Sequence, residues 1–193
     1  MHSVMHSGTC IAESVSMATY TNDKTISNAA AEQKFIEVLK SFDNAMLISG
    51  VSGHQGVGMH ARPMSIAEVD KDGVLWFLTG KDTEKAFEIS RESEAMAVMQ
   101  GNVRYLSVSG NAEIVEDRAK VHALWKEPMR AWFDGKDDPR IVLIALRPSA
   151  AEYWDNTGIS GVRFALRYAK AMLTGEELRQ PPGNTATHGK VQL

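Results

Sequence analysis

The sequence predicts a mainly β protein, a small antiparallel β-barrel with helices packed on its outside. About six or seven segments show the composition and alternation of strands, at spacings typical of hairpins. Roughly three or four further segments have the apolar period of amphipathic helices. No strand–helix–strand unit recurs along the chain, so a doubly wound parallel sheet is not expected. Together these observations favour an antiparallel barrel.

Composition and charge describe an ordinary globular chain. Its 193 residues suffice for one domain with a sizeable core, and 44% of them are hydrophobic. The net charge of −3 shows none of the basic excess of nucleic-acid binders, so no nucleic-acid partner is expected. Cys10 is the only cysteine and cannot form an internal disulfide. No apolar run is long enough to span a membrane and no secretory h-region occurs, so we expect no membrane contact and a cytoplasmic location.

The chain divides into three expected segments. Residues 1–26 are rich in Ser, Thr, Met and His without a regular period, and we expect a flexible N-terminal tail. Residues 27–176 contain the periodic segments and form the predicted folded domain. Residues 177–193 show no such pattern and are expected to be a flexible C-terminal tail.

The domain opens with a helix and a strand. A Ser-Asn pair can cap a helix over residues 29–42. Its apolar face contains Phe35, Leu39 and Phe42. A strand over residues 45–51 follows.

A glycine-rich loop comes next. Residues 56–61 formally match the G-x-G-x-x-A dinucleotide fingerprint, but the Arg-Pro pair that follows forces extended backbone where a helix should begin. We therefore expect a hairpin loop between two strands. His54 and His60 flank this loop without a third ligand at metal spacing, so we expect both to be loop residues and predict no metal site.

The central segment, residues 60–89, combines two strands, a turn and a helix start. Its first strand contains Arg-Pro-Met-Ser at 62–65, and Asp-Lys-Asp-Gly at 70–73 predicts a hairpin turn. The second strand covers 74–79. A Thr-Gly-Lys-Asp-Thr-Glu-Lys run then opens a helix at 86–89.

More strands follow downstream. They are expected over residues 95–100 and 104–115, and Gly110 inside the second predicts a bulge or bend. A helix begins at Asp117, and a nearly continuous apolar strand covers 141–146.

A basic amphipathic helix is expected over residues 161–173, with Gly175 as its C-terminal cap. Such a helix can contact a membrane or an acidic partner. The favoured interpretation places it on the barrel, with its basic side toward solvent.

Several side chains that suit a phosphate group come close together in the sequence. Thr79, Thr83 and Lys85 offer two hydroxyls and an ammonium near a strand end and a helix N-terminus, where backbone N–H groups also favour an anion. Arg62, on the preceding strand, can reach the same anion or a ring carbonyl. A capped helix with an ordinary surface lysine explains the same spacing, and on spacing alone it is the favoured interpretation.

A resemblance to a known family favours the phosphate site. Residues 62–65 and 76–86 resemble the flavin site of pyridoxamine 5'-phosphate oxidase-like split barrels, and in particular their bacterial general-stress-protein branch. Residues 105–113, 135–139 and 152–155 are similar to recurring segments of that branch. The resemblance extends over roughly residues 30–176, and it rests on several motifs in order.

The resemblance implies a Greek-key split β-barrel that forms a homodimer and binds FMN at the subunit interface. It places four residues along the flavin ring and ribityl chain: Arg62, Pro63, Met64 and Ser65. Tyr105 matches a position that often contacts the ring.

The remaining implied contacts surround the flavin and its phosphate. Leu78 and Thr79 would flank the flavin, while Thr83 and Lys85 would hold the phosphate. Trp154 matches an aromatic position that closes the site and can come from the second subunit.

Two departures from the family pattern bear on activity. True pyridoxamine phosphate oxidases carry a substrate-gripping Arg-x-His stretch, which residues 155–164 lack, and they usually have Arg where this chain has Glu84. We therefore expect an FMN-binding protein of the general stress type with redox activity on an unidentified partner, and not the vitamin oxidase. Two alternatives stay open: a flavin reductase that uses NAD(P)H, and a non-catalytic barrel that binds a ligand or a protein.

Overall fold

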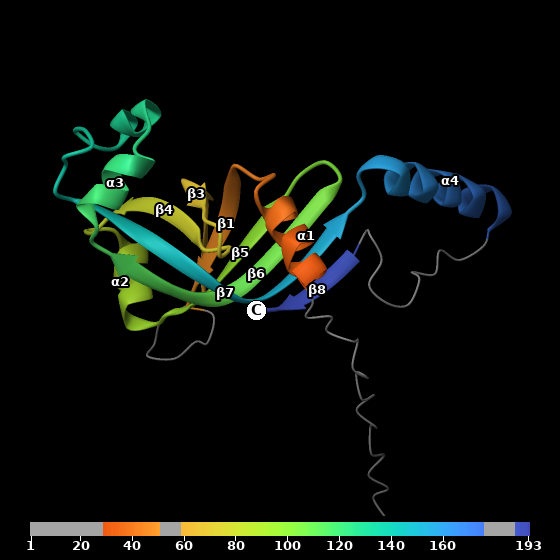
Figure 1. Cartoon of the computed structure of the whole chain (residues 1–193), viewed down its shortest axis with the longest axis horizontal. Helices are drawn as coiled ribbons and strands as arrows, with labels where there is room; N and C mark the ends of the chain where they lie inside the picture. The colour runs from red at the N-terminus through yellow and green to blue at the C-terminus, as the bar shows by residue number, and fades with distance from the viewer. Residues whose placement is uncertain (1–28, 51–58, 176–187) are drawn as a thin grey trace, which may run out of the picture.

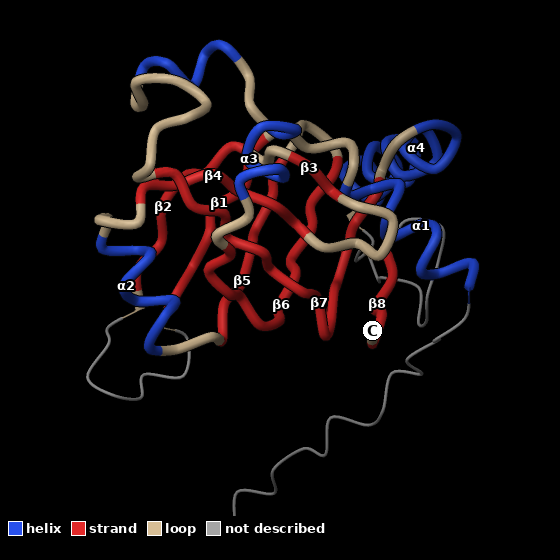
Figure 2. The backbone as a smooth tube through the Cα atoms, turned by 60° about the vertical axis from the view of Figure 1, so that its left-hand side comes forward, coloured by secondary structure: helices blue, strands red, loops and turns tan. Residues whose placement is uncertain are grey.

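The computed structural model describes residues 29–50, 59–175 and 188–193, which form one antiparallel sheet flanked by helices (Figures 1 and 2). The eight strands lie in the order β2-β1-β5-β6-β7-β4-β3, with β8 paired to β7. The strands are β1 (Asn44–Ser49), β2 (His60–Ser65), β3 (Glu68–Val69), β4 (Leu75–Gly80), β5 (Glu94–Gln100), β6 (Arg104–Val115), β7 (Ile141–Asp155) and β8 (His188–Gln192). The helices are α1 (Ala29–Leu39), α2 (Glu84–Arg91), α3 (Arg118–Leu124), the 3-10 helix η2 (Glu127–Ala131) and α4 (Gly158–Thr174).

The sheet curls into a half-barrel (Figure 1). All of the strand pairs described are antiparallel, and the predicted mainly β class with flanking helices is confirmed. Strands β2 and β4 stand far apart in the strand order, yet the curl brings them into contact. This approach matters for function, because the predicted phosphate-binding residues come from both strands.

Hydrophobic side chains pack on both faces of the sheet, because successive residues of a strand point to opposite faces. The larger cluster lies inside the curl and contains Phe35 and Leu39, which confirms the apolar face predicted for the first helix. That helix ends at Leu39, three residues before the predicted end. A smaller cluster lies against α3 and contains Val121, Leu124, Ile141 and Leu143.

The predicted turn at residues 70–73 is present, but it joins different strands from those expected. Gly73 has a φ of 79°, and Asp70 Oδ1 accepts hydrogen bonds from the amides of Asp72 and Val74 at 2.9 and 3.0 Å. The turn connects β4 to the short strand β3. The strand that carries Arg62 pairs with β1 instead. Local sequence predicted the turn, whereas strand pairing depended on the whole sheet.

Strand β7 is the longest element of the sheet. It was expected to end near Leu146, but it continues through Pro148 to Asp155. Pro148 lies opposite Gly110, where the register shifts between Ser109 and Gly110, so the predicted irregularity is confirmed. A bulge tolerates proline because it removes the need for a regular ladder hydrogen bond.

The expectation of a flexible tail over residues 177–193 is wrong for its last part. His188–Gln192 form β8 and pair with the second half of β7. Val191 is buried in the main cluster, and a Cβ on Gly189 would come within 2.5 Å of the Tyr153 ring. Gly189 and Val191 are the buried residues of β8, and two alternating positions are too few to be recognised as a strand in the sequence. The predicted N-terminal tail, residues 1–26, lies outside the described residues.

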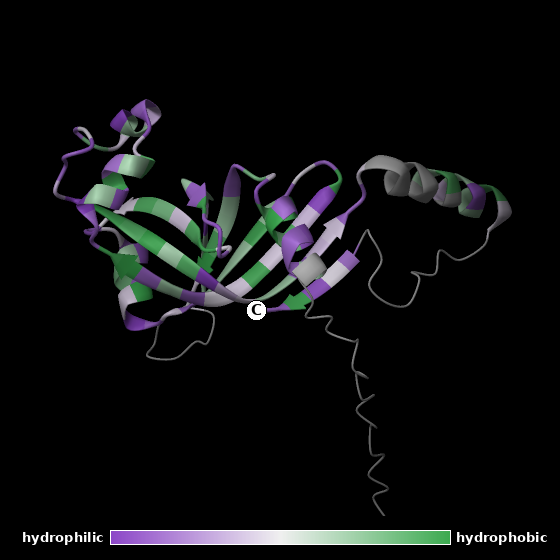
Figure 3. Cartoon of the chain, in the orientation of Figure 1, coloured by the Kyte–Doolittle hydropathy of each residue, from purple (hydrophilic) through white to green (hydrophobic). Residues whose placement is uncertain are grey.

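Helix α4 follows β7 and ends where it was predicted to end. Gly175 adopts the left-handed conformation, with φ of 69°, and its N–H donates to Ala171 O. The helix does not lie on the barrel as expected: it projects beyond the sheet, and Met172 and Leu173 are 72% and 88% exposed (Figures 1 and 3). Among the described residues no helix has the length and apolar character needed to cross a membrane.

An ion-pair cluster around Asp155 anchors the base of α4. Its carboxylate accepts from Arg104 Nε at 3.1 Å, from Lys34 Nζ at 2.9 Å and from the amide of Thr157 at 3.0 Å. Burial alone would raise the pKa of Asp155, but the hydrogen bonds from Arg104, Thr157 and Lys34 outweigh it and hold that pKa well below its usual range. The cluster therefore ties α1 and β6 to the end of β7.

Substituting Gly110→Ala should destabilise the protein by about 3 kcal/mol, because the new methyl group would overpack a site with no room. An added Cβ would lie 1.9 Å from the Arg147 carbonyl oxygen, which belongs to the backbone and cannot swing away. Gly101→Ala is the matched control, since its Cβ would meet nothing closer than 3.6 Å. Urea unfolding of both variants measures the difference, and equal midpoints would contradict the close approach of β6 and β7.

Candidate functional site

The structure brings four of the predicted site residues together at one end of the half-barrel. Arg62 comes from β2, Thr79 from β4, and Thr83 and Lys85 from the start of α2. The hydroxyls of Thr79 and Thr83 contact each other, Arg62 contacts Glu88 of α2, and the charge of Arg62 acts on Lys85. This group is called the α2 site below.

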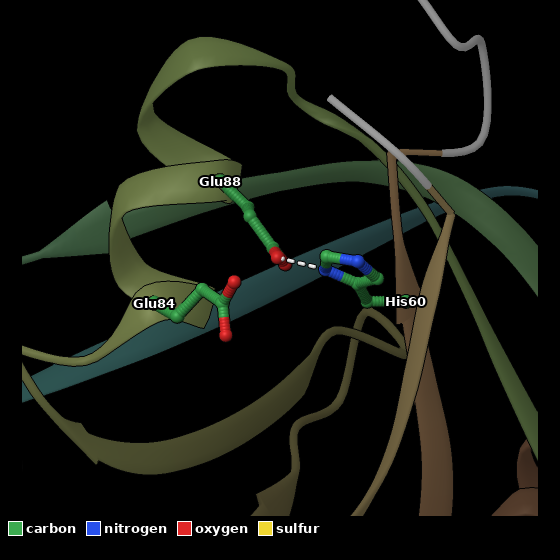
Figure 4. Close-up of side chains that lie close together, drawn as sticks. All are labelled: His60, Glu84 and Glu88. Carbon is green, nitrogen blue, oxygen red and sulfur yellow. Dashed lines mark hydrogen bonds and ion pairs between the residues drawn. The ribbon is translucent and has the colours of Figure 1, made fainter. Parts of the chain in front are cut away.

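Arg62 is held by a buried acidic network. Its Nη2 donates to Glu88 Oε2, and its Nη1 donates to Ser49 Oγ at 2.7 Å. Ser49 Oγ in turn donates to the same carboxylate. His60 Nδ1 contacts the other carboxylate oxygen, Glu88 Oε1 (Figure 4). Three side chains from β1 and β2 therefore meet at the carboxylate of Glu88 on α2.

The network keeps Glu88 ionised despite its burial. Burial alone would raise the pKa of Glu88, but hydrogen bonds from Ser49 and His60 and the charge of Arg62 outweigh it and lower that pKa. The carboxylate is 5% exposed and the Arg62 side chain 19%. A buried ion pair of this kind is costly to break, because one charge would be left without a partner.

The start of α2 presents hydroxyl and amide groups. Thr79 Oγ1 and Thr83 Oγ1 lie 3.2 Å apart, and Thr83 Oγ1 donates to Gly80 O at 2.7 Å. Thr83 is the N-cap residue, but its side chain makes no capping hydrogen bond to the helix. First-turn amides without a side-chain cap, together with the helix dipole, favour an anion at this position.

Lys85 is a partly buried cation within the site. Burial lowers the pKa of its ammonium, and the nearby positive charge of Arg62 lowers it further, although Glu88 opposes this effect. Arg62 already has a carboxylate partner. An anion bound between Thr83 and Lys85 would relieve the repulsion between the two cations.

His60, Glu84 and Glu88 also lie close enough to be considered as metal ligands. One ligand atom of each falls within 4.8 Å of the others (Figure 4). The Glu88 carboxylate, however, is already bound by Arg62, and Lys85 adds a second positive charge nearby. We therefore assign this cluster to charge balance around Arg62.

The other predicted residues of β2 and β4 point in different directions. Met64 packs against the main hydrophobic cluster, Pro63 is exposed, and Ser65 Oγ donates to Asn44 Oδ1 at 2.9 Å. Leu78 packs in the smaller cluster near α3, on the opposite face of β4 from Thr79. One copy of the chain thus does not place Leu78 beside the α2 site.

Tyr105 and Trp154 lie at the far end of the sheet. They are direct partners across β6 and β7, and the Trp154 ring stacks on His188 with centroids 5.1 Å apart. Thr79 pairs with Val142, twelve residues before Trp154 on the same strand. At a rise of about 3.3 Å per residue, roughly 40 Å of strand separates the two positions. Within one copy, these aromatic residues do not contribute to the α2 site.

Sequence reasoning missed three residues of the site: Ser49, His60 and Glu88. His60 was expected to be a loop residue, but it begins β2 and contacts Glu88. Glu88 had a signal, because it is an acidic residue between Ala86 and Ile89 on the buried face of α2. A charged residue on such a face needs a partner, and only the folded chain reveals Arg62 in that role.

Comparison with known proteins places the chain in a family. Residues 30–179 match the family described as pyridoxamine 5'-phosphate oxidase like. The chain belongs to this family. It is 28% identical over 123 residues to General stress protein 26 of Bacillus subtilis (strain 168). The aligned region covers 61% of this chain and 83% of that relative. The resemblance to the general-stress-protein branch is thereby confirmed.

Solved structures share the fold of this family member. A protein from Jannaschia sp. CCS1 assigned to general stress protein 26 aligns with a TM-score of 0.66 and 28% identity, covering 86% of this chain and all of that one. The general stress FMN/FAD binding protein of Xanthomonas citri aligns with a TM-score of 0.55 and 29% identity, over 68% of this chain and 92% of that one. The split-barrel class predicted from the sequence is confirmed.

We predict that Lys85 titrates below the ordinary lysine value of 10.5, because burial and the charge of Arg62 both disfavour its ammonium form. A 13C NMR titration of the lysine Cε signals measures this pKa. Exposed Lys71 should move in the opposite direction, since its hydrogen bond to Asp72 raises its pKa. In Arg62→Met the Lys85 midpoint should rise, and an unchanged midpoint would show that the two cations do not interact.

Proposed function

We propose that this family member binds FMN non-covalently, with the flavin phosphate at the α2 site. The observation that carries the proposal is the donor set at the start of α2. It consists of the paired hydroxyls of Thr79 and Thr83, the partly buried Lys85 of the first turn, and a helix start without a side-chain cap. A relative of 29% identity is named as an FMN/FAD binding protein, which supports the same assignment.

The chemistry of these donors fits a phosphate monoester. Such a group carries up to two negative charges and accepts several hydrogen bonds, which hydroxyls, amides and an ammonium supply together. Glu84 is the acidic residue of the first helical turn, and Asp82 precedes the N-cap; both side chains are exposed, so solvent screens their charges. Bound FMN would supply redox chemistry, while the protein residues would hold and orient it.

We further propose that the flavin site is completed by a second copy of the chain. Tyr105 and Trp154 match family positions that contact and close the site, yet they lie at the opposite end of β7 from Thr79. A symmetric dimer can bring the aromatic end of one copy to the α2 site of its partner. The exposed apolar residues of α4, which starts just after Trp154, also support a second copy at that end.

Lys85→Met should weaken FMN binding about 30-fold and leave riboflavin binding nearly unchanged, because riboflavin lacks the phosphate and one charge-assisted hydrogen bond is worth about 2 kcal/mol. Quenching of flavin fluorescence measures both affinities. Lys81→Met is the matched control, since it removes an exposed lysine of the preceding turn. Equal weakening by the two variants would contradict the proposed phosphate site, and a wild-type protein without saturable FMN binding would refute the function.

A subunit-mixing experiment tests the shared site. Lys85→Met and Trp154→Ala should each impair FMN binding alone. Random pairing of the two variants should restore about a quarter of the sites, because each mixed dimer contains one site without either substitution. Co-expression with two different tags and FMN titration at a concentration near the wild-type Kd gives the fraction. No gain over the separate variants would mean that the two residues do not act across a subunit interface.

A further inference from the structure

We propose that strand β8 supplies a positioning residue to the flavin site: His188 fixes the indole ring of Trp154, the aromatic side chain proposed to close the site of the second copy. The inference rests on the proposed FMN function and on the shared site. Residues 188–192 lie beyond the match to the family at 30–179, so the family pattern does not include this contact.

The register of β8 carries the first step. His188 lies directly opposite Trp154, and Lys190 lies opposite Glu152. Side chains of directly opposed residues on antiparallel strands lie on the same face of the sheet. His188 is therefore the direct cross-strand neighbour of Trp154 on β8, as Tyr105 is on β6.

The inner face of β8 holds the strand in place. Val191 is buried in the main hydrophobic cluster. The Gly189 backbone lies so close to the Tyr153 ring that an added Cβ would come within 2.5 Å of it. All 5 residues of the strand also pair with β7. These contacts fix the backbone that carries His188 on the opposite face.

The contacts of the His188 ring carry the second step. The imidazole stacks on the Trp154 indole, with centroids 5.1 Å apart and an angle of 16° between the planes. Its Nε2 donates to Glu152 Oε1 at 2.8 Å, since an ionised carboxylate can only accept. Glu152 lies two residues before Trp154 on β7 and thus on the same face of the sheet. The imidazole is therefore held by Glu152 while its flat face covers one face of the indole.

An indole that is already fixed lowers the entropic cost of closing over a flavin. A free tryptophan side chain samples several rotamers, and ordering it on binding costs free energy. Stacking on an imidazole that is itself held removes part of this cost before the ligand binds. One face of the indole is occupied by His188, so the flavin would contact its other face or its edge.

His188→Ala should raise the Kd for FMN and the Kd for riboflavin by the same factor, about fivefold, because it removes one aromatic contact that orders Trp154. Quenching of flavin fluorescence measures both constants. His188→Phe should restore most of the affinity, since a phenyl ring keeps the stacking. Gln192→Ala is the matched control: it shortens another side chain of β8, opposite Ala150, and should leave both constants at their wild-type values.

A double-mutant cycle tests whether His188 acts through Trp154. In a Trp154→Ala background, His188→Ala should cause no further loss of flavin affinity. A second fivefold loss in that background would overturn the proposal, because His188 would then act independently of the indole. Unchanged affinities in His188→Ala, a loss confined to FMN, or an equal loss in Gln192→Ala would overturn it as well.

Glu152→Ala provides a second variant in case His188→Ala fails to fold. It removes the carboxylate that holds the imidazole and leaves the ring itself in place. Both flavin affinities should therefore fall together, by a smaller factor than in His188→Ala. Wild-type affinities for both flavins in Glu152→Ala would contradict the role of the imidazole hydrogen bond.

A measurement on the flavin-free protein separates this inference from the proposed function. With 5-fluorotryptophan, 19F NMR gives one signal for each of the 4 tryptophans, and Trp154→Phe identifies the signal of Trp154. That signal should move in His188→Ala and stay in place in Gln192→Ala. A wild type that shows this behaviour but binds no flavin would refute the FMN proposal. A wild type that binds FMN, with a Trp154 signal unaffected by His188→Ala, would refute the positioning role alone.

Discussion

The architecture depends on the continuous pairing of strand β7. Its fifteen residues pair with β4 at one end, with β8 at the other and with β6 along almost their whole length. These ladders satisfy the backbone hydrogen-bonding groups that burial would otherwise leave without partners. The close contact with β6 requires a residue without a side chain at Gly110, where the register shifts. The same strand therefore connects the α2 site with the aromatic end of the sheet.

The curl of the sheet creates the α2 site. Strands β2 and β4 are separated in the strand order by four others, and only curvature brings Arg62 near Thr79 and α2. Glu88 then joins helix and strands through a single carboxylate that binds Arg62, Ser49 and His60. An ionised group at 5% exposure is stable here because each of its oxygens has a hydrogen-bonding partner. Arg62 is thus held by Glu88 and Ser49, whereas Lys85 lies in the first turn of α2.

Membership in the pyridoxamine 5'-phosphate oxidase-like family explains the fold. Residues 155–164 contain no Arg-x-His stretch, so the vitamin oxidase activity is not part of the function that we propose. In this chain that region is the start of α4, a helix whose described side chains project away from the barrel.

Local patterns in the sequence determined much of this protein. The bounds of β6, the irregularity at Gly110, the turn at Asp70 and the cap at Gly175 all follow from preferences of neighbouring residues, and all are present. The fold class follows from strand spacing in the same way. The hydroxyls and the ammonium of residues 79–85 could be grouped from the sequence because they are close together in the chain.

The tertiary structure alone decided which distant residues meet. No short sequence pattern predicts that β8 pairs with β7 or that Arg62 pairs with Glu88. Nor does one predict that Leu78 and Thr79 lie on opposite faces of β4. The pairings of Arg62 and β8 depend on contacts between residues more than twenty positions apart, and the energy of such contacts depends on the curvature of the whole sheet. Sequence therefore placed Thr79, Thr83 and Lys85 close together in the chain, and the folded sheet decided that Arg62 pairs with Glu88.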